Sequence, residues 1–96
     1  MKITKTSCRM NINNGSSYLI YICKSYEDAK VIETMLRTTA CMFASIGWYF
    51  SIQISEAQRD CRIPEFFHDR GYWICCLEHN NGDWDAEQRY ELFIVE

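Results

Sequence analysis

Hydrophobic and polar residues alternate near the start of the chain with the two-residue period of a β-strand. The alternation runs from Cys8 to Ile12 within the segment 2–13, and residues 17–24 (SYLIYICK) are rich in aliphatic and aromatic side chains. Between them lies Asn13-Asn14-Gly15-Ser16, whose Asn-Gly pair tolerates positive φ at both central positions of a tight turn. These segments predict an opening β-hairpin.

The pattern then changes to the period of an amphipathic helix. Ser25 is suited to cap the helix N-terminus, and Asp28, three positions on, resembles the acid of a capping box. Gly47 is suited to follow the helix end. We therefore predict a helix over residues 26–46. Its predicted apolar stripe consists of Ala29, Ile32, Leu36, Ala40 and Phe43, widened by Val31, Met35 and Met42.

After residue 47 the two-residue period returns, and the segments between the strands carry turn and cap residues. Residues 56–63 are polar, which predicts a loop or an extension of an edge strand. Pro64 and Gly71 bracket a short helix at 64–70, since proline favours the first helical turn and glycine the end. Asn80-Asn81-Gly82-Asp83 contains a second Asn-Gly pair and predicts a second tight hairpin turn. The predicted strands lie at 48–55, 72–79 and 84–95, the last being strongest at 90–95.

These elements predict a single α+β domain that spans residues 1–96 in the order β-β-α-β-(short α)-β-β. Hairpins at both ends, with one long helix between them, imply a largely antiparallel sheet of about five strands. The amphipathic helix is expected to cover one face of that sheet.

Composition narrows the class of protein. With 48% hydrophobic residues the chain can form a core, but so small a domain cannot enclose all its aromatic side chains, which leaves some for a partner surface or self-association. No stretch reaches the roughly 20 apolar residues of a membrane span, and the N-terminus does not resemble a signal peptide. We therefore expect a cytoplasmic protein. Its six cysteines are expected to be mainly reduced and structural, with disulfides or metal ligation as the alternatives.

Charge divides the chain into two unlike halves. Residues 1–48 carry six basic and three acidic side chains, whereas residues 49–96 carry four basic and ten acidic ones, for a net charge of −3. This balance disfavours a protein whose main contacts are to phosphates. An acidic surface instead attracts a basic protein surface and speeds encounter with it. Charge alone is explained at least as well by a solvated surface that keeps the protein soluble. The alternative is a small nucleic-acid-binding or transcription-regulating module that uses Lys2, Lys5 and Arg9 with Tyr18 and Tyr21.

Candidate catalytic and metal-binding residues lack a recognisable motif. The nearest set for zinc combines Cys61, His68, Cys75 or Cys76, and His79, but adjacent residues of a strand point to opposite faces. No local signature joins a cysteine to a histidine as in a cysteine nucleophile. Carboxylate pairs such as Asp83 with Asp85, or Glu65 with Asp69, are common in any acidic chain. We therefore expect no enzyme, no metal and no cofactor.

Acidic residues and one tryptophan near the C-terminus are the candidate partner-binding residues. Trp84 stands between two aspartates directly after the second predicted turn, and tryptophan is frequent among residues that anchor interfaces. A position that caps the end of the core is an equal alternative for Trp84. The full candidate set is Glu78, Asp83, Trp84, Asp85, Glu87 and Glu91.

As a compact, acidic domain without motifs and with an acidic final hairpin at 78–96, the chain resembles the small phage-encoded anti-CRISPR and anti-restriction proteins. The resemblance implies an inhibitor that evades host defence by blocking a nucleic-acid-handling complex in the host cytoplasm, with carboxylates in the places of DNA phosphates. Because the N-terminal half is positive, such DNA mimicry would be confined to one face.

Overall fold

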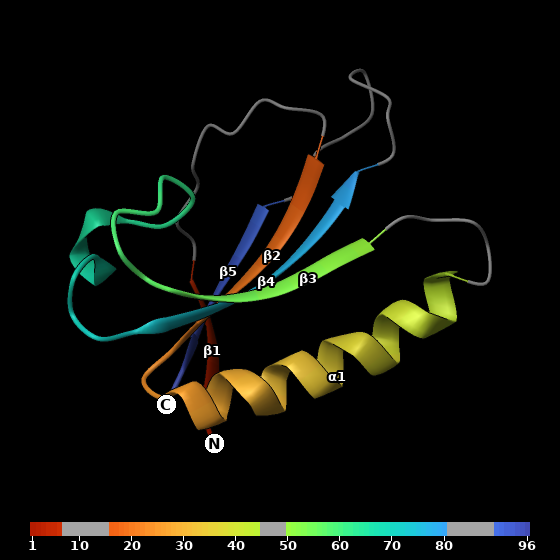
Figure 1. Ribbon diagram of the computed structural model, residues 1–96, viewed down its shortest axis with the longest axis horizontal. Helices are drawn as coiled ribbons and strands as arrows, with labels where there is room; N and C mark the ends of the chain where they lie inside the picture. The colour runs from red at the N-terminus through yellow and green to blue at the C-terminus, as the bar shows by residue number, and fades with distance from the viewer. Residues whose placement is uncertain (7–15, 45–49, 81–89) are drawn as a thin grey trace.

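The computed structural model describes residues 1–6, 16–44, 50–80 and 90–96, with the backbone alone at 40–44 and 80 (Figure 1). Five strands in these segments form one sheet, with one long helix and a single 3-10 turn outside it. In chain order the elements are β1 (Ile3–Thr6), β2 (Ser16–Cys23), α1 (Tyr26–Ala44), β3 (Phe50–Glu56), η1 (Glu65–Phe67), β4 (Trp73–Asn80) and β5 (Tyr90–Val95).

The sheet has the order β1-β5-β2-β4-β3, and every neighbouring pair is antiparallel except β2 with β5. Strands β2 and β3 therefore run in the same direction with β4 between them. The helix α1 connects β2 to β3, so that β2, α1 and β3 form a split β-α-β unit. The predicted α+β fold, with a largely antiparallel sheet and one helix on one face, is confirmed.

The predicted hairpins at the two ends of the chain are wrong. Strand β1 pairs with β5, as in Ile3 with Val95, while β2 is flanked by β5 and β4. Strand β4 is flanked by β2 and β3, so it is not a neighbour of β5. A two-stranded hairpin is marginally stable by itself, and the apolar strand β2 buries more surface between two neighbours. The turn residues 13–15 and 81–83 and the strand predictions at 7–13, 48–49 and 84–89 lie outside the described residues.

Helix α1 begins as predicted and packs on β2, β3 and β4. The backbone N–H of Asp28 donates to the Ser25 hydroxyl at 3.1 Å, which satisfies one of the amides that a helix N-terminus leaves unpaired. Ala29, Ile32 and Leu36 are buried, as the apolar stripe predicted. The rest of the predicted stripe, at 40, 42 and 43, lies outside the described side chains.

The expectation that Val31 and Met35 widen the buried stripe of α1 is wrong. Their side chains are 55% and 42% exposed. A helix on a flat sheet buries only the stripe that faces the strands, and these two residues lie on one flank of that stripe.

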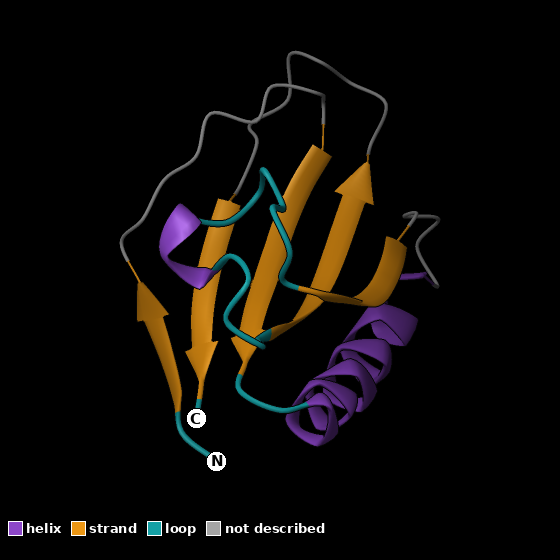
Figure 2. Cartoon of the chain, turned by 60° about the vertical axis from the view of Figure 1, so that its left-hand side comes forward, coloured by secondary structure: helices purple, strands orange, loops and turns teal. Residues whose placement is uncertain are grey.

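A second layer, formed by residues 57–72, covers the opposite face of the sheet (Figure 2). Ile63 and Ala57 of this segment are 1% and 2% exposed and pack with Ile20, Ile74 and Leu92 of the sheet. We call this face the loop side and the face under α1 the helix side. The predicted loop at 56–63 is thus a packed layer.

The short helix predicted at 64–70 is only the 3-10 turn η1 (Glu65–Phe67). His68 has extended backbone angles, and Asp69 has a positive φ of 55°, so the chain leaves the helical conformation within one turn. Aspartate is one of the few residues that adopt this left-handed conformation at modest cost.

Candidate functional site

Of the predicted acidic binding residues, the structure describes Glu78 and Glu91, while Asp83, Trp84, Asp85 and Glu87 lie outside the described residues. Every second residue of a strand lies on the same face, so Glu78 shares the loop side with Cys76. Glu91 lies on the helix side with Phe93, where Lys5 pairs with it at 3.3 Å. The two glutamates thus lie on opposite faces of the sheet. A binding surface that includes the residues at 83–87 stays a prediction.

The structure does not bring together the residues considered for zinc. Cys75 packs in the helix-side core and Cys76 in the loop-side core, as the strand pattern predicted. The His79 ring stacks on Phe50 with 5.0 Å between ring centroids, and the Nε2 atom of His68 is 2.8 Å from the carbonyl oxygen of Asp60. Within the described ranges, no group of three or more potential ligands surrounds a common point.

Burial governs the chemistry of the described thiols. Cys23, Cys61, Cys75 and Cys76 are free, and of these Cys61 is exposed. Desolvation raises the pKa of Cys75 to about 11 and that of Cys23 and Cys76 to about 12. Because the thiolate is the nucleophilic form, the three buried cysteines are poor nucleophiles at neutral pH. Their positions suit core residues.

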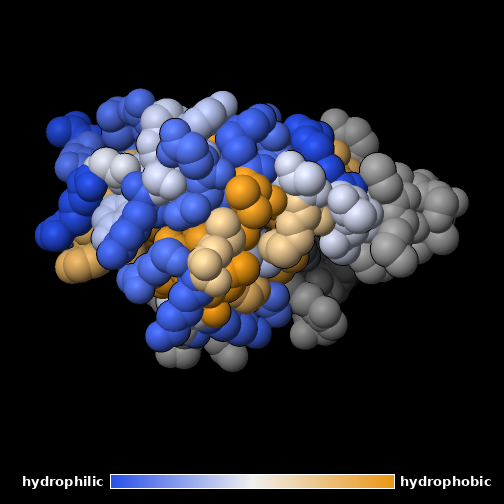
Figure 3. Space-filling model, turned by 90° about the horizontal axis from the view of Figure 1, so that it is seen from below, coloured by the Kyte–Doolittle hydropathy of each residue, from blue (hydrophilic) through white to orange (hydrophobic). Residues whose placement is uncertain are grey.

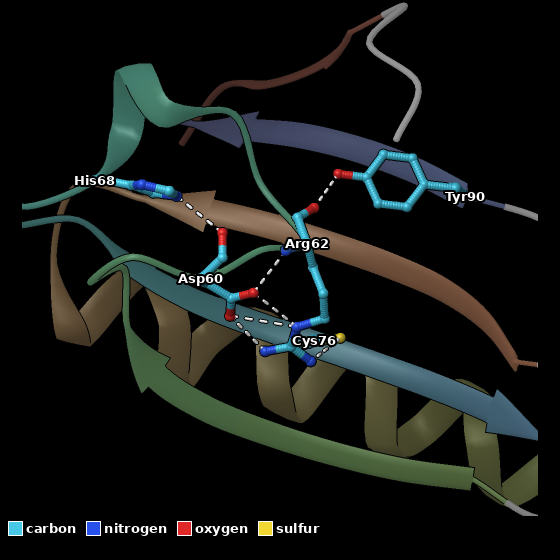
Figure 4. Close-up of polar contacts among 5 residues, drawn as sticks. All are labelled: Asp60, Arg62, His68, Cys76 and Tyr90. Atoms are coloured by element: carbon cyan, nitrogen blue, oxygen red, sulfur yellow. Dashed lines mark hydrogen bonds and ion pairs between the residues drawn. The ribbon is translucent and has the colours of Figure 1, made fainter. Parts of the chain in front are cut away.

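A cluster of polar residues lies between the covering segment 57–72 and the sheet (Figure 4). The guanidinium group of Arg62 donates to Asp60 through Nη2, at 2.6 Å from Oδ2, and through Nε, at 3.0 Å from Oδ1. Its Nη1 atom is 3.4 Å from the Cys76 sulfur, and the Tyr90 hydroxyl donates to the Arg62 backbone carbonyl. The cluster thereby joins the segment to β4 and β5.

Charge within this cluster is balanced. The hydrogen bonds from Arg62 lower the pKa of Asp60, and those to Asp60 raise the pKa of Arg62. Both side chains are partly buried, a setting in which a bidentate pair is stronger than on the surface. The donors and acceptors of the pair are directed at each other and at the protein, so we assign the cluster a structural role.

The basic residues of the N-terminal half are mostly paired with carboxylates. Of the five that the structure describes, four form ion pairs. Tyr18 and Tyr21, which were candidates for stacking on bases, are only 4% and 8% exposed. Tyr18 packs in the loop-side core and Tyr21 in the helix-side core, so they do not form a common stacking surface. The ion pairs are Lys5 with Glu91, Lys24 with Glu96, Lys30 with Glu33 and Arg37 with Glu33.

An exposed apolar surface borders α1 on the helix side. Figure 3, which looks onto the side of the molecule where α1 lies, shows apolar side chains gathered in a patch surrounded by hydrophilic ones. By exposure and strand register we assign to it the exposed Val31 and Met35 of α1 and Ile3 of β1, together with the partly buried Phe93 of β5. We call these four residues the helix-side patch.

Electrostatic neighbours establish which strands lie beside the exposed flank of α1. Asp28, on the same flank as Val31 and Met35, lies close enough to the thiol of Cys23 in β2 for its negative charge to help raise the pKa of that thiol. Glu33, on the other flank, in the same way helps raise the pKa of the Cys75 thiol in β4. The flank with Val31 and Met35 therefore faces β2 and its neighbour β5. Since α1 packs on β2, β3 and β4, the helix side of β5 and β1 extends beyond it.

Sequence reasoning missed the helix-side patch because it assigned Val31 and Met35 to the core. Their spacing of four residues was a visible signal, but only the position of α1 on the sheet separates the buried stripe from its exposed flank.

The comparisons with known proteins add no relative: no protein-family model, no curated protein and no solved structure matches the chain. In the described part of the chain, no helix is both long and apolar enough to span a membrane.

Proposed function

We propose that this protein acts by binding another protein and is not itself a catalyst. The observation that carries the proposal is the helix-side patch, where Val31 and Met35 expose about half of their side-chain surfaces. Contiguous exposed apolar surface is typical of protein interaction sites, because monomers gain nothing from leaving it in water. Methionine also adapts its shape to a partner surface at low energetic cost.

The charges beside the patch favour a partner that is apolar at the centre of the contact and basic at its edge. Glu27 and Asp28 lie in the first turn of α1, and Glu91 lies on the helix side of β5. Among the described residues, Lys5 pairs with Glu91 at 3.3 Å. A partner with lysine or arginine at its rim gains both encounter rate and specificity from this arrangement.

The more specific form of the proposal is an inhibitor of a nucleic-acid-handling host defence complex, as carried by phage. It rests on the resemblance described above and on the acidic C-terminal half of the chain. In this form the residues at 83–87 contribute carboxylates to the same partner.

The proposal is tested by capture from a nuclease-treated bacterial lysate with four versions of the tagged protein. These are the wild type, Val31→Glu/Met35→Glu in the patch, Phe66→Glu as the matched control, and Asp83→Lys/Asp85→Lys/Glu87→Lys. Phe66 is an exposed apolar residue of η1, away from the helix side, so its variant adds a charge elsewhere. Captured proteins are identified by mass spectrometry.

The proposal expects one complex at near-stoichiometric yield with the wild type and Phe66→Glu, and its loss with the patch variant. Loss with the lysine variant as well supports the acidic contribution. Added wild-type protein should then inhibit the purified complex. Recovery of nothing after nuclease, but of nucleic acid without it, contradicts the proposal and supports a nucleic-acid-binding module instead.

A further inference from the structure

The two edges of the sheet differ in how well they are protected against pairing with another strand. Strand β1 has four residues, of which Lys5 is charged. Strand β3 has seven residues, FSIQISE, and no charge before its last residue, Glu56. Natural proteins usually protect edge strands by keeping them short or by placing lysine, proline or a bulge in them. Strand β3 has neither lysine nor proline.

The outer backbone groups of β3 can be assigned from its ladder with β4. The backbone N–H of Ala57 donates to the carbonyl of Tyr72, directly opposite, at 3.0 Å, so this amide points towards the β4 side of the strand. In an antiparallel strand this direction alternates, so the amide and carbonyl groups of Ile52 and Ile54 point away from β4. Strand β3 ends the sheet among the described residues, so these groups face no further strand there.

The side chains of β3 are self-complementary. Ser51, Ile52, Gln53, Ile54 and Ser55 read the same in both directions. If two copies pair antiparallel with Gln53 opposite Gln53, isoleucine faces isoleucine on the helix side and serine faces serine on the loop side. In this register the outward groups of Ile52 meet those of Ile54 in the second copy, as a hydrogen-bonded pair requires.

We propose that the outer edge of β3 binds a second copy of this chain, so that two sheets join into one continuous sheet across a twofold axis at Gln53. Such closed, symmetric contacts are the commonest form of homo-oligomer. Because the axis is perpendicular to the sheet, the α1 helices and the helix-side patches of both copies lie on the same side. In the dimer the two patches therefore face the same way but lie towards opposite ends of the joined sheet, because each patch borders β5 and β1, on the side away from β3. The dimer does not depend on the proposed function.

Gln53 gives the sharpest test because its side chain is exposed. In the proposed dimer it lies beside Gln53 of the second copy, at the twofold axis. Opposite residues of such a non-hydrogen-bonded pair have Cα atoms about 4.5 Å apart, so like charges there repel strongly. We would prepare Gln53→Lys and Gln53→Glu, with Thr34→Lys as a control that adds the same charge on exposed α1 surface. Sedimentation equilibrium gives the dimer dissociation constant, and circular dichroism checks the fold of each variant.

The wild type and Thr34→Lys are expected to dimerise at concentrations on the order of 100 µM, as suits a small interface. Gln53→Lys and Gln53→Glu alone should each dimerise at least about 10-fold more weakly. An equimolar mixture of the two should restore a dimer, because lysine then faces glutamate. A monomeric wild type overturns the proposal, as do unchanged dimerisation of folded Gln53→Lys and failure of the mixture to restore the dimer.

Discussion

Ile63 tests whether residues 57–72 form a packed layer of the protein or a surface loop. Its side chain is 1% exposed and packs in the loop-side core, although the segment around it has the polar composition of a loop. Truncation of a buried isoleucine to alanine removes apolar contacts and leaves a cavity, at a cost of about 2–5 kcal/mol. A substitution on an exposed loop changes stability by no more than about 0.5 kcal/mol. We therefore expect Ile63→Ala to lower the free energy of unfolding by about 3 kcal/mol.

Urea unfolding, followed by tryptophan fluorescence and circular dichroism, measures this cost. With a denaturant slope of about 1.5 kcal/mol per molar, a loss of about 3 kcal/mol lowers the midpoint by about 2 M. Ile32→Ala, in the buried stripe of α1, is the matched core control, and Ile3→Ala, at a side chain that is 43% exposed, is the surface control. If Ile63→Ala resembles Ile3→Ala while Ile32→Ala is strongly destabilised, the segment does not cover the sheet and the reasoning is refuted.

Three further predictions concern the ion pair, the helix cap and the thiols. Asp60→Asn should destabilise the protein at neutral pH. Pairing lowers the folded-state pKa of Asp60 below its ordinary value of 3.8. The difference in the free energy of unfolding between the wild type and the variant, measured by urea titration, should therefore be intact above about pH 5 and shrink as the pH falls below about 4. A difference that stays constant with pH would contradict the pairing. Ser25→Ala should cost about 1 kcal/mol in the same assay, and no loss would argue against the cap. Iodoacetamide at neutral pH should alkylate Cys61 well before Cys75 and Cys76, as peptide mapping can show, and equal rates would contradict their burial.

Local periodicity predicted the elements of this fold but not their arrangement. The helix cap at Ser25 and the strand at 73–80 each follow from a local pattern that spans only a few neighbouring residues. The choice of strand partners depends on contacts between distant segments, so two Asn-Gly turns suggested hairpins that the sheet order excludes. A turn signal shows that the chain can reverse direction. It does not select the neighbour of the strand that follows.

The helix-side patch and the covering segment were missed for the same reason. Whether Val31 is buried depends on where α1 lies across the sheet, which no helical period specifies. Ile63 was a lone aliphatic residue in a polar stretch, and its burial arises because residues 57–72 cross the loop side. Composition, by contrast, supported the expectation of surplus apolar surface, because a chain of 96 residues cannot enclose so many large side chains.

The most direct test of the proposed function is the affinity of the captured partner for purified wild-type, Val31→Glu/Met35→Glu and Phe66→Glu proteins, measured by calorimetric titration. Two apolar contacts replaced by charges at the centre of an interface should weaken binding at least about 100-fold, whereas Phe66→Glu should bind within about threefold of the wild type. Circular dichroism would establish that each variant is folded. Wild-type affinity in the folded patch variant would contradict the account, because the partner would then bind elsewhere on the protein.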